Sequence, residues 1–253
     1  MKSFRLHKIR TAAAVLLTAA ILAGGIFAGK TLGVFCMGNY GVSQTPPVKG
    51  TPLEGKTVLF LGSSVTYGYA AFGHSFADDL REIYGVNAVK EAVSGTTLAD
   101  LTESSYVSRL KKVDADLRPD AVLCQLSTND ATKGVPLGEI GAGFEKDGFD
   151  TATVAGAIEY IIACVKDTWG CPIVFYTQTR YESEAYAAMT ALLLKIGEKW
   201  EIGVIDLWND DAFNDITDAQ RQCWLADAIH PTKAGYREWW LPVIAEGLEK
   251  VFR

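Results

Sequence analysis

The stretch TVLFLGSSVT, Thr57 to Thr66, decides the fold, because it joins an apolar run to a glycine and two adjacent serines. A short apolar run that ends in small polar residues is typical of a buried strand. In a parallel sheet with helices on both faces, functional groups collect after the carboxyl ends of the strands. The stretch therefore predicts a buried strand, Thr57–Leu61, that brings two hydroxyl groups to one edge of a sheet.

Similar apolar runs, rich in β-branched residues, recur along the chain and alternate with longer stretches of helical periodicity. This alternation predicts an α/β protein, a three-layer α/β/α sandwich with a five-stranded parallel sheet of flavodoxin-like type. The other expected strands are Ala88–Ala92, Ala121–Leu126, Ile173–Thr177 and Val204–Leu207. The expected helices are Ser75–Tyr84, Leu98–Lys112, Thr151–Lys166, Glu184–Trp200 and Ala234–Phe252, and Trp239 and Trp240 in the last of them are expected in the core.

The N-terminal region predicts export or membrane attachment. Four basic residues within the first ten precede an uncharged stretch, Thr11–Gly29, rich in Ala, Leu and Ile. Apolar character resumes after Lys30 and no A-x-A site is visible, which favours an uncleaved anchor over a cleaved signal peptide and places the rest of the chain outside the cytoplasm. We therefore divide the chain into an anchor or signal segment (1–38), a linker rich in Pro, Gly, Ser and Thr (39–56), and a folded domain (57–253).

Composition excludes other classes of protein. The 253 residues carry a formal net charge of −6, and no block of lysine or arginine follows the first ten residues. A nucleic-acid-binding surface needs such a block, so we expect no nucleic-acid partner. The five cysteines, Cys36, Cys124, Cys164, Cys171 and Cys223, form no C-x-x-C motif and no zinc-spaced cluster with histidine. The sequence predicts no metal site, and it leaves open whether Cys164 and Cys171 pair.

Polar groups follow several of the expected strands. Ser63 and Ser64 follow the first strand, Gly95 follows the second, Asn129 follows the third, and "DAIHP", Asp227 to Pro231, precedes the last helix. Because the carboxyl ends of parallel strands meet at one edge of the sheet, we expect these groups to converge there.

The converging residues have the chemistry of acyl transfer. A serine nucleophile needs a base, and that base needs a third group to orient it. The histidines beyond the N-terminal segment are His74 and His230, and we favour His230, because Asp227 lies three residues before it and Pro231 biases it away from helical geometry. Gly95 and Asn129 can supply a backbone N–H and an amide to a developing oxyanion.

These blocks resemble those of the SGNH (GDSL-type) hydrolases. "GSSVT" resembles the family's G-D-S-L-[ST] block, "VSGTT" its glycine block, "STND" its G-x-N-D block and "DAIHP" its D-x-x-H-P block. The resemblance extends over nearly the whole chain from Thr57 onward and implies the same α/β/α fold. Two positions depart from it: Ser63 replaces the usual aspartate, and Ser127 replaces the glycine of G-x-N-D.

Residue by residue, the resemblance implies a serine esterase that needs no metal and no organic cofactor. Ser64 is the nucleophile, His230 the general base and Asp227 its orienting carboxylate. The oxyanion hole is formed by the N–H groups of Ser64 and Gly95 and by the amide of Asn129.

The substrate is less well defined by the sequence. Gln178, Arg180 and Tyr181 follow the fourth strand and are expected within reach of the substrate, although they are equally compatible with an ordinary loop. The glycine-rich stretch 133–149 is long enough to act as a lid. We expect short acyl groups, such as acetyl, on carbohydrate or cell-envelope polymer. A lipase or lysophospholipase, an acyltransferase and a non-catalytic polysaccharide-binding module remain alternatives.

Overall fold

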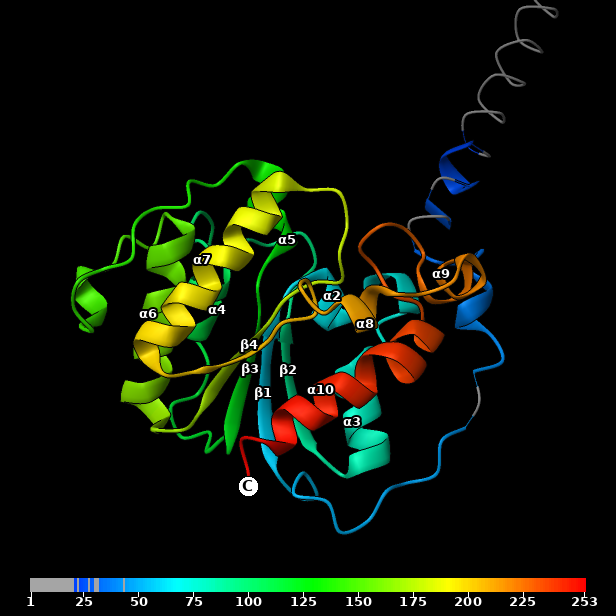
Figure 1. The fold of residues 1–253 in the computed structure, drawn as a ribbon, viewed down its shortest axis with the longest axis horizontal. Coiled ribbons are helices and arrows are strands. Elements are labelled where there is room, and N and C mark those ends of the chain that lie inside the picture. The colour runs from blue at the N-terminus through cyan, green and yellow to red at the C-terminus, as the bar shows by residue number, and fades with distance from the viewer. Residues whose placement is uncertain (1–20, 22, 27, 30–31, 43) are drawn as a thin grey trace, which may run out of the picture.

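The computed structural model describes residues 21, 23–26, 28–29, 32–42 and 44–253. Its centre is a five-stranded parallel sheet with the strand order β2-β1-β3-β4-β5 (Figure 1). The strands are β1 (Thr57–Gly62), β2 (Asn87–Ala92), β3 (Ala121–Gln125), β4 (Ile173–Tyr176) and β5 (Gly203–Ile205). The predicted fold class is confirmed, and each predicted strand is present with bounds within one or two residues of those expected.

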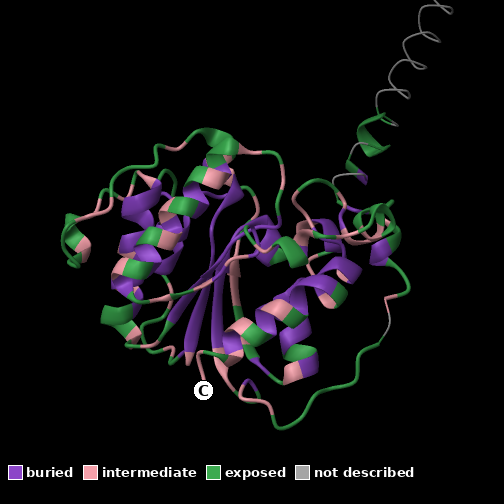
Figure 2. Ribbon diagram, viewed as in Figure 1, coloured by how far each residue is buried: buried purple, intermediate pink, exposed green. Residues whose placement is uncertain are grey.

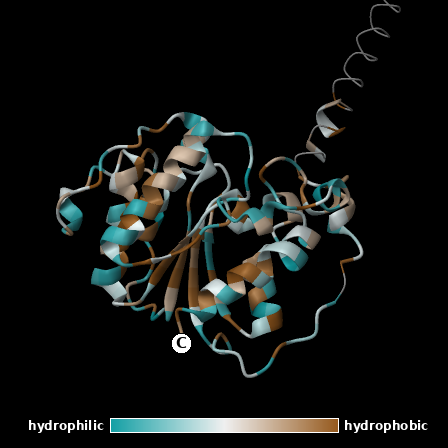
Figure 3. Cartoon of the chain, in the orientation of Figure 1, coloured by the Kyte–Doolittle hydropathy of each residue, from teal (hydrophilic) through white to brown (hydrophobic). Residues whose placement is uncertain are grey.

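Alternate residues of the central strands enter opposite cores. Leu59 and Leu61 of β1 pack with helices on one face of the sheet, whereas Val58 and Phe60 pack with helices on the other. The central strands are buried and apolar, while the longer covering helices turn an exposed, more polar side to solvent (Figures 2 and 3). Burial on both faces explains why these strands read as continuous apolar runs in the sequence.

Helices cover both faces of the sheet (Figure 1). One face carries α4 (Tyr106–Leu110), α6 (Val154–Trp169) and α7 (Glu184–Trp200), and the other carries α3 (Phe76–Tyr84), η4 (Gly235–Trp240) and α10 (Leu241–Glu249). Shorter elements are η1 (Met37–Asn39), α2 (Ser64–Tyr67), η2 (Tyr69–Ala71), α5 (Thr128–Lys133), η3 (Lys146–Gly148), α8 (Asp211–Asn214) and α9 (Asp218–Trp224).

Two of the predicted helices differ in kind from the structure, and the helix expected at Thr151–Lys166 is present as α6, shifted three residues along the chain. The expected helix Leu98–Lys112 is reduced to α4, because the Asp130 carboxylate accepts the N–H groups of Leu98 and Ala99 and holds that stretch as a loop. The expected helix Ala234–Phe252 begins as the wide π-helical turn η4 and continues as α10. Trp239 and Trp240 of this turn are 6% and 0% exposed, as predicted for core residues.

Most of the predicted N-terminal anchor, including residues 1–20, lies outside the described residues. Within the described part of the chain, no helix is long and apolar enough to cross a membrane. Residues 33–40 pack against the folded domain, and Asn39 is only 6% exposed. This segment begins before the predicted boundary at residue 57, and it makes specific contacts with the domain.

Candidate active site

Three side chains predicted from two separate parts of the sequence form a hydrogen-bonded chain. His230 Nε2 lies 2.8 Å from Ser64 Oγ, and His230 Nδ1 lies 2.8 Å from Asp227 Oδ2 and 3.0 Å from Oδ1. Ser64 is the first residue of α2, directly after β1, and is 7% exposed. The arrangement is that of a nucleophile, a base and an orienting carboxylate, within hydrogen-bonding reach of one another.

The Asp227 carboxylate is held in its ionised form. Burial alone raises the pKa of this carboxyl, but hydrogen bonds from the His230 ring and from the N–H groups of Ile229 and His230 outweigh it and hold the pKa below its ordinary value. An ionised Asp227 accepts the Nδ1 proton of His230, which leaves Nε2 as an acceptor for the Ser64 hydroxyl proton. The carboxylate thereby sets the tautomer that a general base requires.

The turn that carries Ser64 is fastened by Gln125 at the end of β3. Gln125 Oε1 accepts hydrogen bonds from the Ser63 N–H at 2.9 Å and from the Thr66 hydroxyl at 2.8 Å. The Ser63 N–H can only donate, so it fixes which end of the Gln125 amide faces the turn. A Cβ on Gly62 would lie 1.7 Å from Thr66 Oγ1, so only glycine fits where the turn closes. Sequence reasoning missed Gln125, because it reads as an interior residue of a strand.

The expected oxyanion donors lie beside this turn. Gly95 is exposed, with φ at +80°, and the space around it is open: a Cβ there would meet no atom within 4 Å. Asn129 Nδ2 donates to Thr96 O at 3.0 Å and to Ser63 Oγ at 3.2 Å. The Ser63 hydroxyl therefore directs the Asn129 amide toward the turn that carries Ser64, a contact that the sequence analysis did not anticipate for the residue replacing the family's aspartate.

Two charged residues brace the loop that carries Gly95. Asp130, fully buried, accepts N–H groups from Leu98 and Ala99, and burial raises the pKa of its carboxyl. Arg109 is 7% exposed. Its guanidinium donates to the carbonyl of Gly62, the last residue of β1, and to the carbonyl of Glu91 in β2. Its guanidinium also reaches the Glu91 carboxylate at 3.0 Å. Sequence reasoning did not single out Arg109, because an arginine in an expected helix usually marks a solvated face.

The three residues expected near the substrate occupy different environments. Gln178 is 1% exposed, and its Nε2 donates to the carbonyl of Ile229, directly before His230. Arg180 points toward α8, where its guanidinium donates to Trp208 O at 3.1 Å and pairs with Asp211. The Tyr181 ring packs edge-on against Trp208, and burial raises the pKa of its phenol to about 12. The structure thus gives Gln178 a contact with the histidine loop and directs Arg180 and Tyr181 toward α8 and its flanking residues.

The stretch 133–149, expected to act as a lid, makes contacts with α6 and α7. Within the stretch 133–149, the Gly141 N–H donates to the buried Glu159 carboxylate of α6 at 2.7 Å, and Phe144 packs edge-on against Trp200 of α7. Lys199 of α7 pairs with Glu159 and also donates to Gly141 O. The stretch therefore starts beside the Gly95 loop, where Lys133 Nζ donates to Gly95 O at 2.9 Å, and its part around residues 141–144 is fixed along α6 and α7 by the compensated Glu159 charge.

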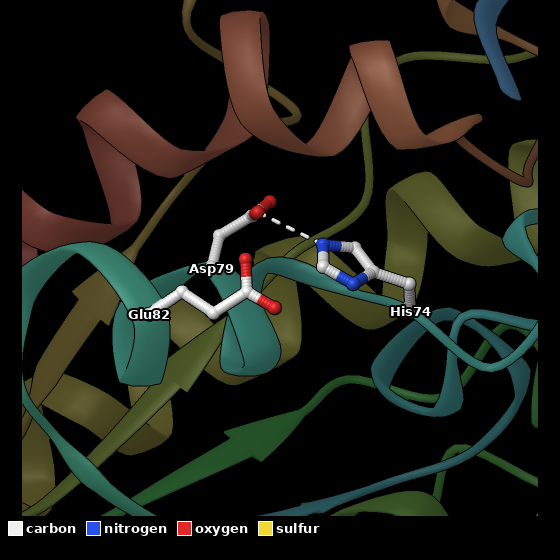
Figure 4. Close-up of side chains that lie close together, drawn as sticks. All are labelled: His74, Asp79 and Glu82. Atoms are coloured by element: carbon white, nitrogen blue, oxygen red, sulfur yellow. Dashed lines mark hydrogen bonds and ion pairs between the residues drawn. The ribbon is translucent and has the colours of Figure 1, made fainter. Parts of the chain in front are cut away.

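His74 and three of the cysteines make contacts away from the Ser64–His230 pair. His74 Nε2 lies 2.8 Å from Asp79, and Glu82 lies nearby, so three groups of metal-ligating type converge (Figure 4). The Arg237 guanidinium contacts both Asp79 and Glu82 and supplies a cation to these carboxylates. Cys124 is buried, and Cys164 and Cys171 are both free thiols.

The fold and this site define an ester-bond hydrolase of the α/β/α class, and comparison with known proteins agrees. A sequence model of the GDSL-like Lipase/Acylhydrolase family matches residues 60–238, so the chain belongs to that family. The search of curated proteins found no match.

Solved structures share the fold. A protein from Lactobacillus plantarum is 21% identical with a TM-score of 0.63, over 78% of this chain and 96% of that one. A protein described as a GDSL-like lipase from Bacteroides ovatus is 19% identical with a TM-score of 0.56, over 77% of this chain and 98% of that one. One described as an acylhydrolase from Bacteroides fragilis is 16% identical with a TM-score of 0.55, over 87% and 96% of the two chains.

Proposed function

We propose that the protein is a serine esterase that works through an acyl-enzyme on Ser64. The observation that carries this proposal is the 2.8 Å contact between His230 Nε2 and Ser64 Oγ, with Asp227 on the other ring nitrogen. Asp227 and the nucleophile turn are each fixed by several hydrogen bonds, so the site is preorganised before substrate arrives.

The reaction follows from these contacts. Ser64 Oγ attacks the ester carbonyl while His230 Nε2 takes its proton. The carbonyl oxygen becomes an oxyanion, which accepts from the N–H groups of Ser64 and Gly95 and from Asn129 Nδ2 once that amide gives up its contact with Ser63 Oγ. Collapse breaks the bond to the alcohol, which leaves with the proton from His230. Water then repeats the sequence on the acyl-enzyme, and the acid is released with Ser64 restored.

The proposed substrate is a short acyl ester, such as acetyl, on carbohydrate or cell-envelope polymer. An open site supports a polymer substrate: Gly95 is exposed, the Asp227 side chain is 49% exposed, and the glycine-rich loop lies along α6 and α7 around residues 141–144. A bulky chain can therefore approach the nucleophile from solvent.

The proposed location is outside the cytoplasm, with the chain tethered by its N-terminal segment. Support comes from the sequence of that segment, in which basic residues precede an apolar stretch. Protection of the folded domain from external protease after any outer layer has been opened would contradict this location, whereas its digestion under the same conditions supports it.

Hydrolysis of a panel of esters tests the activity and its range. We expect p-nitrophenyl acetate and acetylated polysaccharide to be cleaved with higher kcat/KM than p-nitrophenyl palmitate or a lysophospholipid. The opposite order would favour a lipase, and acyl transfer to added sugar at the expense of hydrolysis would favour an acyltransferase. Binding to polysaccharide with no turnover of any ester would favour a non-catalytic module.

A further inference from the structure

The segment between the apolar N-terminal stretch and the sheet is fitted closely to the catalytic domain. A Cβ on Gly33, whose φ is +72°, would lie 2.0 Å from Ala70 O, and a Cβ on Gly38 would lie 1.9 Å from Cys223 O. These approaches leave no room for a side chain at either position. The segment containing η1 accordingly lies beside α9, at the end of the sheet where α2 begins (Figure 1).

Asn39 is the polar centre of this contact. Its Nδ2 donates to Gly33 O at 2.8 Å and to Ala70 O at 2.7 Å, and its Oδ1 accepts the Lys233 N–H at 2.9 Å. All three partners are backbone groups, and Asn39 is 6% exposed. The set requires two donors and one acceptor on a short side chain, which a primary amide provides and a carboxylate does not.

The two distant partners of Asn39 belong to the two halves of the candidate active site. Ala70 lies in η2, directly after the helix that begins with Ser64, and its neighbour Tyr69 packs its ring 5.6 Å from the His230 ring. Lys233 follows His230 by three residues. Asn39 therefore joins the nucleophile segment to the base segment from outside the site.

We propose that Asn39 is a positioning residue, which holds the Ser64 and His230 segments at the separation that proton transfer requires. This inference rests on the proposed function. It makes the segment 33–39 a working part of the enzyme, although the sequence reads it as the end of an anchor and the start of a linker. The Tyr236 hydroxyl also donates to Val65 O at 2.7 Å, so we expect the domain to fold when Asn39 is replaced, with the fine adjustment of the two segments lost.

The test uses the full chain with Asn39→Ala and Asn39→Asp, and Asn87→Ala as a control for the loss of an exposed amide far from the site. Asn87 Nδ2 also donates to a backbone carbonyl, Gly55 O at 3.0 Å, but this contact lies at the opposite end of the sheet. The measurements are kcat and KM for p-nitrophenyl acetate, the rate of inactivation by a fluorophosphonate, and the thermal unfolding transition.

We expect both Asn39 variants to fold cooperatively and to lose kcat and inactivation rate by about tenfold or more with little change in KM, because small displacements of reacting groups have effects of this order. Asn87→Ala should react like the wild type. Wild-type rates in a folded Asn39 variant would overturn the proposal, as would failure of both variants to fold, which would make Asn39 a residue of global stability. A wild type that does not react with the fluorophosphonate would instead overturn the proposed function.

Discussion

His230 Nε2 and Ser64 Oγ lie 2.8 Å apart, although 166 positions separate the two residues in the sequence. The sheet brings them together, because Ser64 begins the helix after β1 and His230 lies in the connection that precedes the C-terminal helices. Each of the two residues is also held by a third residue. Gln125 fixes the turn before Ser64, and Asp227 accepts hydrogen bonds from the ring and from the backbone N–H of His230. The relationship is therefore a property of the fold.

The lowered pKa of Asp227 predicts a pH-dependent contribution to stability. Because its pKa is lower in the folded protein than in the unfolded chain, ionised Asp227 stabilises the fold above the ordinary carboxyl pKa, and this contribution is lost as the pH falls through the folded-state pKa. The difference in free energy of unfolding between the wild type and Asp227→Asn should therefore shrink between pH 7 and pH 3. Urea denaturation at both pH values measures it, and a difference that grows on acidification would contradict the assignment.

Replacement of the Asn129 amide should affect the reaction and spare substrate binding. For Asn129→Ala we expect kcat to fall by about 10²–10³-fold with KM nearly unchanged, as for the loss of one oxyanion donor. Steady-state kinetics on p-nitrophenyl acetate measures this. An Asn129→Ala variant with unchanged kcat would remove Asn129 from the oxyanion hole.

Gly95→Ala is the companion variant. The site has room for a methyl group, but φ of +80° disfavours alanine, so we expect a loss of about 1–2 kcal/mol in the free energy of unfolding.

Restoring the family's aspartate at position 63 should harm this protein. Ser63 is fully buried, with its hydroxyl 3.4 Å from Gln125 Oε1, and the Ser63 N–H fixes that oxygen in place. In Ser63→Asp a carboxylate would face this oxygen and also capture the Asn129 amide, so we expect a loss of about 1–3 kcal/mol in stability, the range for an imperfectly compensated polar group, together with reduced kcat. Chemical denaturation and kinetics check both, with Ser63→Ala, which removes the hydroxyl without adding a charge, expected to be less impaired than Ser63→Asp. Equal or better activity in a fully stable Ser63→Asp would show that the turn is not adapted to serine.

Replacement of Lys199 tests whether the glycine-rich loop 133–149 takes part in catalysis or only in stability. Glu159 is fully buried, and Lys199 is its charged partner. Among the described residues, Lys199→Met leaves the carboxylate with the N–H donors of Trp200 and Gly141. We expect a loss of about 3–5 kcal/mol in the free energy of unfolding, as for a buried ion pair that loses one partner, and unchanged kcat and KM at a temperature where the variant is folded. A change in KM at such a temperature would return the loop to the role of a lid.

Much of the fold and site could be predicted from the sequence, because their signals are local. The buried strands read as apolar runs, and residues that follow parallel strands must meet at one edge of the sheet. Asp227 and His230 lie in one short loop, so their contact needs no knowledge of the rest of the chain.

The residues that brace the site could not be predicted, because tertiary structure alone defines their partners. Gln125 lies within a strand, and Arg109 lies in an expected helix whose first half Asp130 converts to a loop. Asn39 lies in a stretch whose composition is that of a linker. Each binds backbone N–H or carbonyl groups far away in the sequence, and backbone groups carry no residue-specific signal.

The most direct test of the account is the site of covalent reaction with a fluorophosphonate probe, read by intact mass and peptide mapping. We predict one adduct, on Ser64, which disappears in Ser64→Ala, persists in Ser63→Ala, and forms far more slowly in His230→Ala. No adduct on the wild type, or an adduct on Ser63 that survives in Ser64→Ala, would contradict the assignment of Ser64 as the nucleophile.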